Sequence, residues 1–130
     1  MDILTAARRW ADVWNRAWPA ADVEAIAALY AGDADFSSHP FRDRQPPSEY
    51  VSWAFADQAE AMCRFGEPVA AGERAAVDWW AVVTDTSGAE ETLAGTSLLR
   101  FRDDGLVVEQ RDVWAREPGR RELPEWAPAS

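Results

Sequence analysis

The chain has 130 residues, a length at which one domain can bury a hydrophobic core without disulfides or a metal. Its composition, 48% apolar with 8 tryptophans, excludes a disordered chain. The net charge of -10 argues against nucleic acid or an anionic membrane surface as a partner, because both require a cationic face.

Sulfur and imidazole are scarce. The chain has one cysteine, Cys63, and one histidine, His39. A single cysteine excludes an internal disulfide, and one cysteine with one histidine cannot form a metal site without several carboxylates. We therefore expect no metal and no cofactor. The first residues lack the pattern of a secretory leader, and no run approaches the ~18 apolar residues of a membrane span. The sequence thus predicts a cytoplasmic protein.

Two helices are predicted at the beginning of the chain. Thr5 to Trp18 has an apolar face at helical spacing, which we interpret as core, and Pro19 is expected to end it. Asp22 is the expected N-cap of a second helix, whose apolar stripe reaches Tyr30 and whose left-handed exit is assigned to Gly32. The apolar face of the first of these helices is formed mainly by Trp10, Trp14 and Trp18.

A short irregular region follows, in which Asp35–Ser38 is predicted to be a strand. Phe36 and Phe41 flank His39 and Pro40. Imidazole suits acid/base chemistry near neutral pH, so His39 is a candidate catalytic residue. The alternative is a turn histidine whose ring caps a backbone group next to Pro40.

A third helix is expected from the Pro46-Pro47-Ser48 start to about Met62. Tyr50 lies on its apolar face, whereas Trp53 points away from the centre of that face. Such an off-face tryptophan suggests the lip of a pocket, a subunit contact or packing under a loop.

Four strands separated by turns complete the domain: Cys63–Ala70, Arg74–Thr84, Glu91–Arg102 and Leu106–Arg116. The spacing of the turns makes them antiparallel neighbours. The strand Arg74–Thr84 has apolar residues on both faces, with Asp78 and Trp80 on one and Trp79 on the other. We expect one face of the sheet to pack on the helices and the other to meet a second subunit.

The last strand carries the residue that most needs an explanation. Alternation places Gln110, Asp112 and Trp114 on the face of Val108. A carboxylate among such neighbours must be paired, solvated or used in function, because desolvating its charge is costly. The alternative is an aspartate without a functional role at the end of a strand, where it is solvated or paired to an arginine. Asp78 is a second acid that could hold the same role.

The order of elements predicts an α+β fold in which three N-terminal helices pack on a curved, mainly antiparallel sheet. Where helix tips and strand ends do not meet, such a sheet leaves a cavity with aromatic walls. Residues 117–130, with three prolines, a glycine and charges, are predicted to form an irregular tail anchored by Trp126. This tail could cover the cavity mouth, cross a partner subunit or stay mobile.

Five motifs, in order and at matching spacing, resemble the nuclear transport factor 2-like superfamily and specifically its SnoaL-like branch. The resemblance covers about residues 5 to 116, and we predict that residues 1–116 form one domain. The motifs are the run from Trp14 to Tyr30, Phe36-x-Ser-His-Pro-Phe-Arg42, Val77-Asp-Trp-Trp80, Gly95-Thr-Ser-x2-Arg-Phe101 and Asp104-Gly-x5-Arg-Asp-x-Trp114.

The resemblance implies a cone-shaped α+β barrel with a deep pocket, often dimerising through the convex sheet face. It does not supply a reaction, because this fold hosts cyclases, isomerases, epoxide hydrolases, dehydratases and non-catalytic members. SnoaL-like cyclases place an acid on a late strand facing the cavity, which corresponds to Asp112. An epoxide-hydrolase-like site is disfavoured because Arg111 and Asp112 face opposite ways, and a scytalone-dehydratase-like site needs two histidines. A ketosteroid-isomerase-like site needs a tyrosine, for which Tyr30 and Tyr50 are available.

Two hypotheses remain. The first is a cofactor-independent isomerase, cyclase or lyase that acts on a small apolar carbonyl compound, with Asp112 as base and His39 or Tyr50 as its partner. The second is a ligand-binding or dimeric association domain without catalysis. Both predict an apolar or aromatic ligand and a homodimer through the sheet. The ligand-binding residues expected are Trp14, Tyr30, Phe36, Phe41, Trp53, Asp78, Trp80, Gln110 and Trp114.

Overall fold

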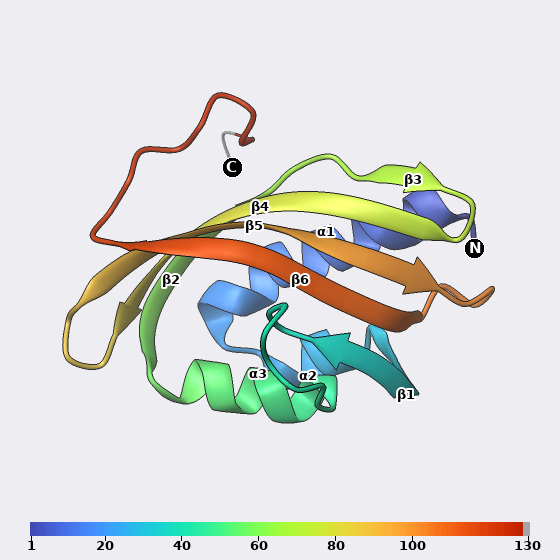
Figure 1. Cartoon of the computed structure of the whole chain (residues 1–130), viewed down its shortest axis with the longest axis horizontal. Helices are drawn as coiled ribbons and strands as arrows, with labels where there is room; N and C mark the ends of the chain where they lie inside the picture. The colour runs from blue at the N-terminus through green and yellow to red at the C-terminus, as the bar shows by residue number, and fades with distance from the viewer. Residues whose placement is uncertain (129–130) are drawn as a thin grey trace.

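A strongly curved sheet wraps around three helices in the computed structural model, which describes residues 1–128 (Figure 1). The elements follow the order α1 (Ile3–Ala20), α2 (Val23–Ala27), β1 (Tyr30–Ser37), α3 (Pro47–Ala56), β2 (Gln58–Phe65), β3 (Val69–Ala71), β4 (Arg74–Asp85), β5 (Glu90–Phe101) and β6 (Val107–Pro118). The helices lie on the concave side, forming a half-barrel. This arrangement confirms the predicted α+β class and the cone-shaped barrel.

The sheet is mainly antiparallel, with the order β1-β6-β5-β4-β2, and β3 pairs with the free part of β4. The three long strands pair in sequence, as the turn spacing predicted; β5 and β6 align from Glu91 opposite Pro118 to Phe101 opposite Val107. The pairing of β1 with β6 is parallel and was not predicted. It joins segments more than 70 residues apart, so local periodicity carries no sign of it.

The first helix is capped by Asp2, whose carboxylate accepts the backbone N–H of Thr5. Its apolar face is buried against the sheet, as predicted. Pro19 does not end the helix, which continues to Ala20. The carbonyl of Asn15, which loses its helical partner to Pro19, is met instead by the Cys63 thiol at 3.6 Å. No helix within residues 1–128 has the length and apolarity needed to cross a membrane.

The predicted boundaries in the middle of the chain were partly wrong. Tyr30 begins β1 rather than ending the second helix, and Gly32 lies within that strand without a positive φ. The third helix ends at Ala56, so that Gln58–Met62 belong to β2. Pairing with β4 explains the change, because it places Ala61 and Cys63 on the buried face. The strand predicted over Cys63–Ala70 is divided between β2 and β3.

The last strand is longer than predicted and ends at Pro118. Beyond it the chain turns back, and in Figure 1 it runs past the end of the sheet and above β4. The carbonyl of Gly119 accepts the Thr92 hydroxyl proton at 2.7 Å, and the Trp126 ring lies against Gly66. The segment from Gly119 to Trp126 therefore covers Thr92 on the sheet face where we expected a second subunit, whereas residues 129 and 130 of the predicted tail lie outside the described residues. The homodimer stays a prediction.

Candidate functional site

A cavity of about 460 Å³ lies between α1, α3 and the concave face of the sheet. This volume falls within the ~300–1,000 Å³ of small-molecule sites. Its walls are aromatic because six of the eight tryptophans line it, two of them from strands and four from helices. They are Trp10, Trp14, Trp18, Trp53, Trp79 and Trp114.

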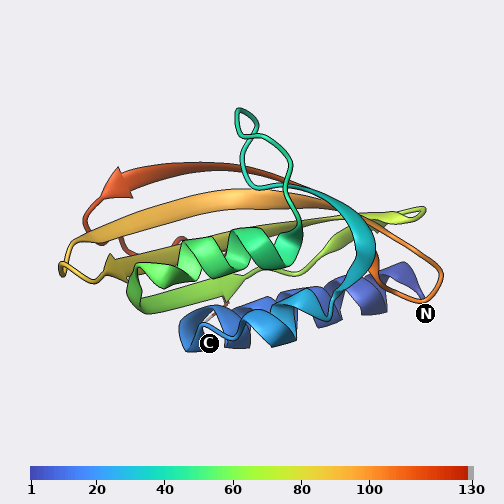
Figure 2. The same cartoon turned by 90° about the horizontal axis from the view of Figure 1, so that it is seen from below.

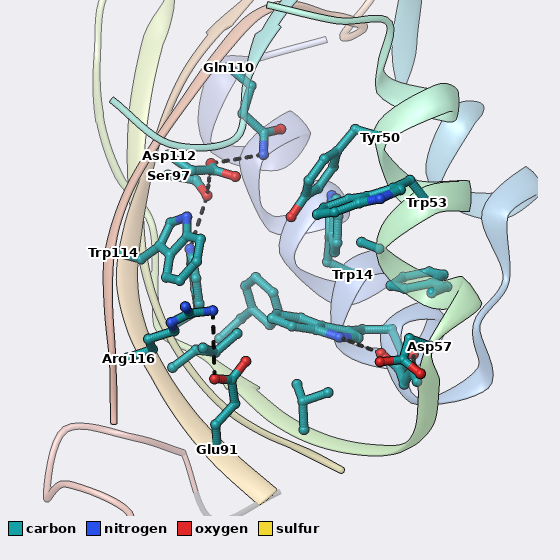
Figure 3. Close-up of a pocket in the computed structure, with 18 of the residues that line it drawn as sticks. Trp14, Tyr50, Trp53, Asp57, Glu91, Ser97, Gln110, Asp112, Trp114 and Arg116 are labelled. Carbon is teal, nitrogen blue, oxygen red and sulfur yellow. Dashed lines mark hydrogen bonds and ion pairs between the residues drawn. The ribbon is translucent and has the colours of Figure 1, made fainter. Parts of the chain in front are cut away.

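Asp112 projects into this cavity from β6, beside Gln110 and Trp114 on the same face (Figure 3). The predicted alternation of the last strand is therefore correct. Oδ1 of Asp112 accepts two hydrogen bonds, from the Ser97 hydroxyl at 2.6 Å and from Nε2 of Gln110 at 3.0 Å. Within residues 1–128 no group hydrogen-bonds Oδ2.

The direction of these hydrogen bonds is set by tryptophan, because an indole N–H can only donate. Trp79 donates to the Ser97 oxygen at 3.0 Å, which leaves the Ser97 proton for Asp112. On the other side, the Tyr30 hydroxyl oxygen accepts the indole N–H of Trp14 at 3.1 Å, and the hydroxyl donates its proton to Oε1 of Gln110. The amide of Gln110 must then direct its NH₂ group toward Asp112. Both chains end at Oδ1, so the proton of a neutral Asp112 belongs on Oδ2.

Burial raises the pKa of Asp112 to about 7, although the hydrogen bonds from Ser97 and Gln110 lower it. The carboxyl is therefore poised to exchange a proton near neutral pH. Burial also raises the pKa of Tyr50, with a further contribution from the charge of Asp112, whereas the Arg42 guanidinium lowers it. Tyr50 is consequently a neutral hydroxyl in the same cavity.

Aromatic and cationic groups close the side of the cavity near α3. The rings of Tyr50 and Trp53 lie 6.0 Å apart along one face of that helix, and Trp53 is 64% exposed. The guanidinium carbon of Arg42 lies 5.6 Å from the centre of the Trp53 ring and 5.2 Å from that of Trp114. Trp53 thus forms a lip of the cavity, one of the three roles considered for it.

The opposite end of the cavity carries acids (Figure 3). Asp57, Asp85 and Glu91 line it, and Glu91 faces Arg116 at 3.9 Å. These residues lie where β2 and β5 begin and where β4 and β6 end. The cavity is therefore polar at this end and aromatic along its length.

A family model described as the SnoaL-like domain matches residues 7–110. The chain belongs to the SnoaL-like family. This match confirms the resemblance found in the sequence motifs. No functionally curated protein matches the chain.

Solved structures share the SnoaL-like fold at low identity. SalBIII, named as an epoxide hydrolase/cyclase-like enzyme in pyran ring formation in polyether salinomycin, is 19% identical, with a TM-score of 0.73, covering 85% of this chain and 91% of its own. A Catenulispora acidiphila protein with a ketosteroid isomerase-like fold, in complex with trimethylamine, is 17% identical, with a TM-score of 0.69 and coverage of 79% and 82%. RV0760c from Mycobacterium tuberculosis is 15% identical, with a TM-score of 0.75 and coverage of 92% and 100%. These likenesses establish the fold alone.

Two residues expected in the cavity of this SnoaL-like chain lie on the outer face of the sheet instead. Asp78 is exposed and accepts the Thr96 hydroxyl proton at 2.7 Å, and Trp80 is directed the same way. The prediction that Trp80 forms a cavity wall is wrong, because Trp79 faces inward in its place. Since both faces of β4 carry apolar side chains, alternation alone could not decide between the two tryptophans.

Three predicted site residues from β1 and the loop between β1 and α3 do not line the cavity. His39 does not line the cavity: its Nδ1 accepts the backbone N–H of Phe41 at 3.2 Å, and its ring packs edge-on against Trp114. This is the turn histidine considered as the alternative. Phe41 is 93% exposed, in the loop that stands out from the fold in Figure 2, so its predicted place in the cavity wall is wrong. Phe36 is buried behind the wall, with its ring 5.2 Å from that of Tyr50.

The prediction missed the acids and Arg116 at the far end of the cavity, and it also missed Ser97, Trp79 and Arg42. Ser97 donates a hydrogen bond to Asp112, and Trp79 donates one to Ser97. The register between β5 and β6 would have placed Ser97 opposite Asp112. Arg42 belonged to a recognised motif, but nothing in its local pattern directs a loop side chain toward a cavity. Tyr30 lies behind the wall rather than in it and acts through Gln110.

Proposed function

We propose that this SnoaL-like chain is a cofactor-independent acid/base enzyme that acts on a small, largely apolar carbonyl compound. The observation that supports it is Oδ2 of Asp112, which accepts no hydrogen bond within residues 1–128 and lies inside an aromatic cavity on a carboxyl whose pKa is about 7. A carboxylate in this setting can remove a proton from the carbon next to a carbonyl group and return it elsewhere. This chemistry serves isomerisation, cyclisation and elimination alike.

Each group has a definite part in the proposed step. Oδ2 of Asp112 takes the proton, and the C–H electron pair moves into the carbonyl group to form an enolate. Tyr50, a neutral donor in the same cavity, can hydrogen-bond the substrate. Ser97 and Gln110 keep Oδ1 occupied and so hold the carboxyl in one orientation. The tryptophan walls exclude water and accommodate the ring of the ligand.

Proton exchange in D₂O tests the proposal, because it requires of a compound only a C–H bond next to a carbonyl group. A panel of cyclic ketones is incubated with the protein, and deuterium incorporation next to the carbonyl is followed by NMR. We expect at least one ketone to exchange faster with the wild type, and Asp112→Asn to lose roughly 10²–10⁴-fold of that acceleration.

Asp78→Asn is the matched control, since it removes an acid from the same sheet on the outer face. It should leave exchange unchanged. If Asp112→Asn exchanges as fast as the wild type, or if the Asp112 carboxyl titrates near 4 by NMR, the chain is a binding domain and the proposal fails.

A further inference from the structure

Arg42 occupies an unusual position at the cavity wall. It lies in the loop between β1 and α3, and its guanidinium is held over two indole rings, Trp53 from α3 and Trp114 from β6. Its Nη1 donates to the Ser38 hydroxyl at 3.3 Å. Contacts with two elements fix the cation beside the cavity despite its origin in a loop.

This cation lacks an acidic partner within residues 1–128. Eight ion pairs occur there, and none includes Arg42. Asp112 lines the same cavity but lies beyond ion-pair distance of it. A guanidinium carries five N–H donors; one donates to the Ser38 hydroxyl, and the group also lies within hydrogen-bonding reach of the Tyr50 hydroxyl, whose pKa it lowers. The remaining donors are available to a ligand.

Charge along the cavity gives a ligand an orientation. The far end of the cavity is lined by three acids, Asp57, Asp85 and Glu91. Among them only Glu91 forms an ion pair with a basic residue of the lining, Arg116. Hydrogen bonds from the Ser87 side chain and the Ala89 backbone hold the pKa of Asp85 below its usual value, so it stays ionised. An anionic group would be repelled from this end and attracted to Arg42.

We propose that Arg42 anchors the ligand by binding an anionic oxygen, a carboxylate or an enolate, on a cyclic compound whose apolar body lies among the tryptophans. This inference rests on the proposed function for the identity of the reacting group. When Oδ2 of Asp112 removes the proton, the electron pair reaches the carbonyl oxygen, and Arg42 stabilises the negative charge that develops there. Return of the proton to carbon restores the carbonyl group.

Binding of a matched pair of probes tests the anchoring role without any turnover. 2-Naphthoate and 2-naphthamide share a ring system that the cavity can hold and differ in the charge of one group. Titrations are followed by quenching of tryptophan fluorescence. We expect the wild type to prefer naphthoate, and Arg42→Gln to lose roughly 10- to 100-fold of naphthoate affinity while naphthamide binding changes little.

Arg116→Gln is the control, because it removes the same charge from the other end of the same cavity. It should retain the naphthoate preference. If Arg42→Gln fails to fold, Arg42→Met gives the same comparison, since its apolar chain can remain between the indole rings. Equal naphthoate affinity in the wild type and the Arg42 variant, or an equal loss in Arg116→Gln, overturns the anchoring role. The proposed function would stand in that case if ketone exchange still depended on Asp112.

Discussion

Ser97 donates its hydroxyl proton to Oδ1 of Asp112 across 2.6 Å while its own oxygen receives the indole N–H of Trp79. Because the indole N–H can only donate, it occupies the serine oxygen as acceptor and leaves the serine proton to be donated to the carboxyl on the next strand. These hydrogen bonds from Ser97 and Gln110 hold a buried acid in an apolar cavity, and within residues 1–128 no cation forms an ion pair with it.

Removing that hydroxyl should raise the pKa of Asp112 above its present value of about 7, because the hydrogen bond stabilises the charged form. Ser97→Ala also leaves the buried N–H of Trp79 without its acceptor, which costs about 1–3 kcal/mol of folding free energy. Titration of the Asp112 carboxyl by NMR measures the first effect. Thr96→Ala, which frees Asp78 on the opposite face, should not shift this pKa; an equal shift would contradict the role of Ser97.

Asp112→Asn should stabilise the fold at pH 8 and change little at pH 4. The folded carboxyl, with a pKa of about 7 against 3.8 for an ordinary aspartate, binds more protons than the unfolded one between these values. The contribution of Asp112 to wild-type stability therefore falls as the pH rises from about 4 to 7 and then levels off, a loss of roughly 4 kcal/mol at most.

The asparagine oxygen can replace Oδ1 and keep both donors satisfied, so the variant should lack this pH dependence. Urea unfolding of both proteins across the pH range provides the measurement. Parallel stability curves for the wild type and the variant would show that Asp112 is not held neutral in the fold.

Gly95→Ala should disrupt the cavity wall. An added Cβ would lie 2.6 Å from Cβ of Trp114, 2.8 Å from Cζ2 of Trp79 and 2.8 Å from the carbonyl of Val113. Two tryptophan side chains and a backbone group must shift, at a cost of about 1–3 kcal/mol. Thermal unfolding and near-UV circular dichroism should both change. Gly32→Ala, in an open part of β1, is the control and should change neither.

Thr92→Val should release the tail from the outer face of the sheet. The Thr92 hydroxyl donates to the carbonyl of Gly119 and accepts the N–H of Arg121 at 2.9 Å, and valine of the same shape can do neither. Trypsin should then cleave after Arg120 or Arg121 several times faster than in the wild type. Thr96→Val serves as the control, and equal cleavage rates for Thr92→Val and the wild type would show that the tail is held by other contacts.

Periodicity located the acid of the site and its neighbours on the same strand, but not Ser97 on β5 and Trp79 on β4. Strict alternation on β6 was enough to place Gln110, Asp112 and Trp114 on one face, because the strand is regular there. On β4 the same rule gave both faces correctly yet could not tell which one is buried, and Trp80 was chosen where Trp79 faces inward. The signal is ambiguous when both faces are apolar.

Long-range pairing and loop conformation explain the remaining differences. The parallel pairing of β1 with β6 brings Tyr30 near the last strand, where it hydrogen-bonds Gln110, and no local pattern encodes this meeting. Arg42 lies in a loop whose conformation depends on Trp53 and Trp114, which belong to other elements. Residues 58–62 suit a helix by propensity, but pairing with β4 makes them strand.

The thiol of Cys63 has a practical consequence. It is 2% exposed, lies on the Asn15 carbonyl that Pro19 leaves free, and burial raises its pKa to about 12. Such a thiol reacts with alkylating reagents only when α1 separates from β2. The chain thus contains its own reporter of opening: the rate at which this one sulfur is labelled measures how often the first helix leaves the sheet.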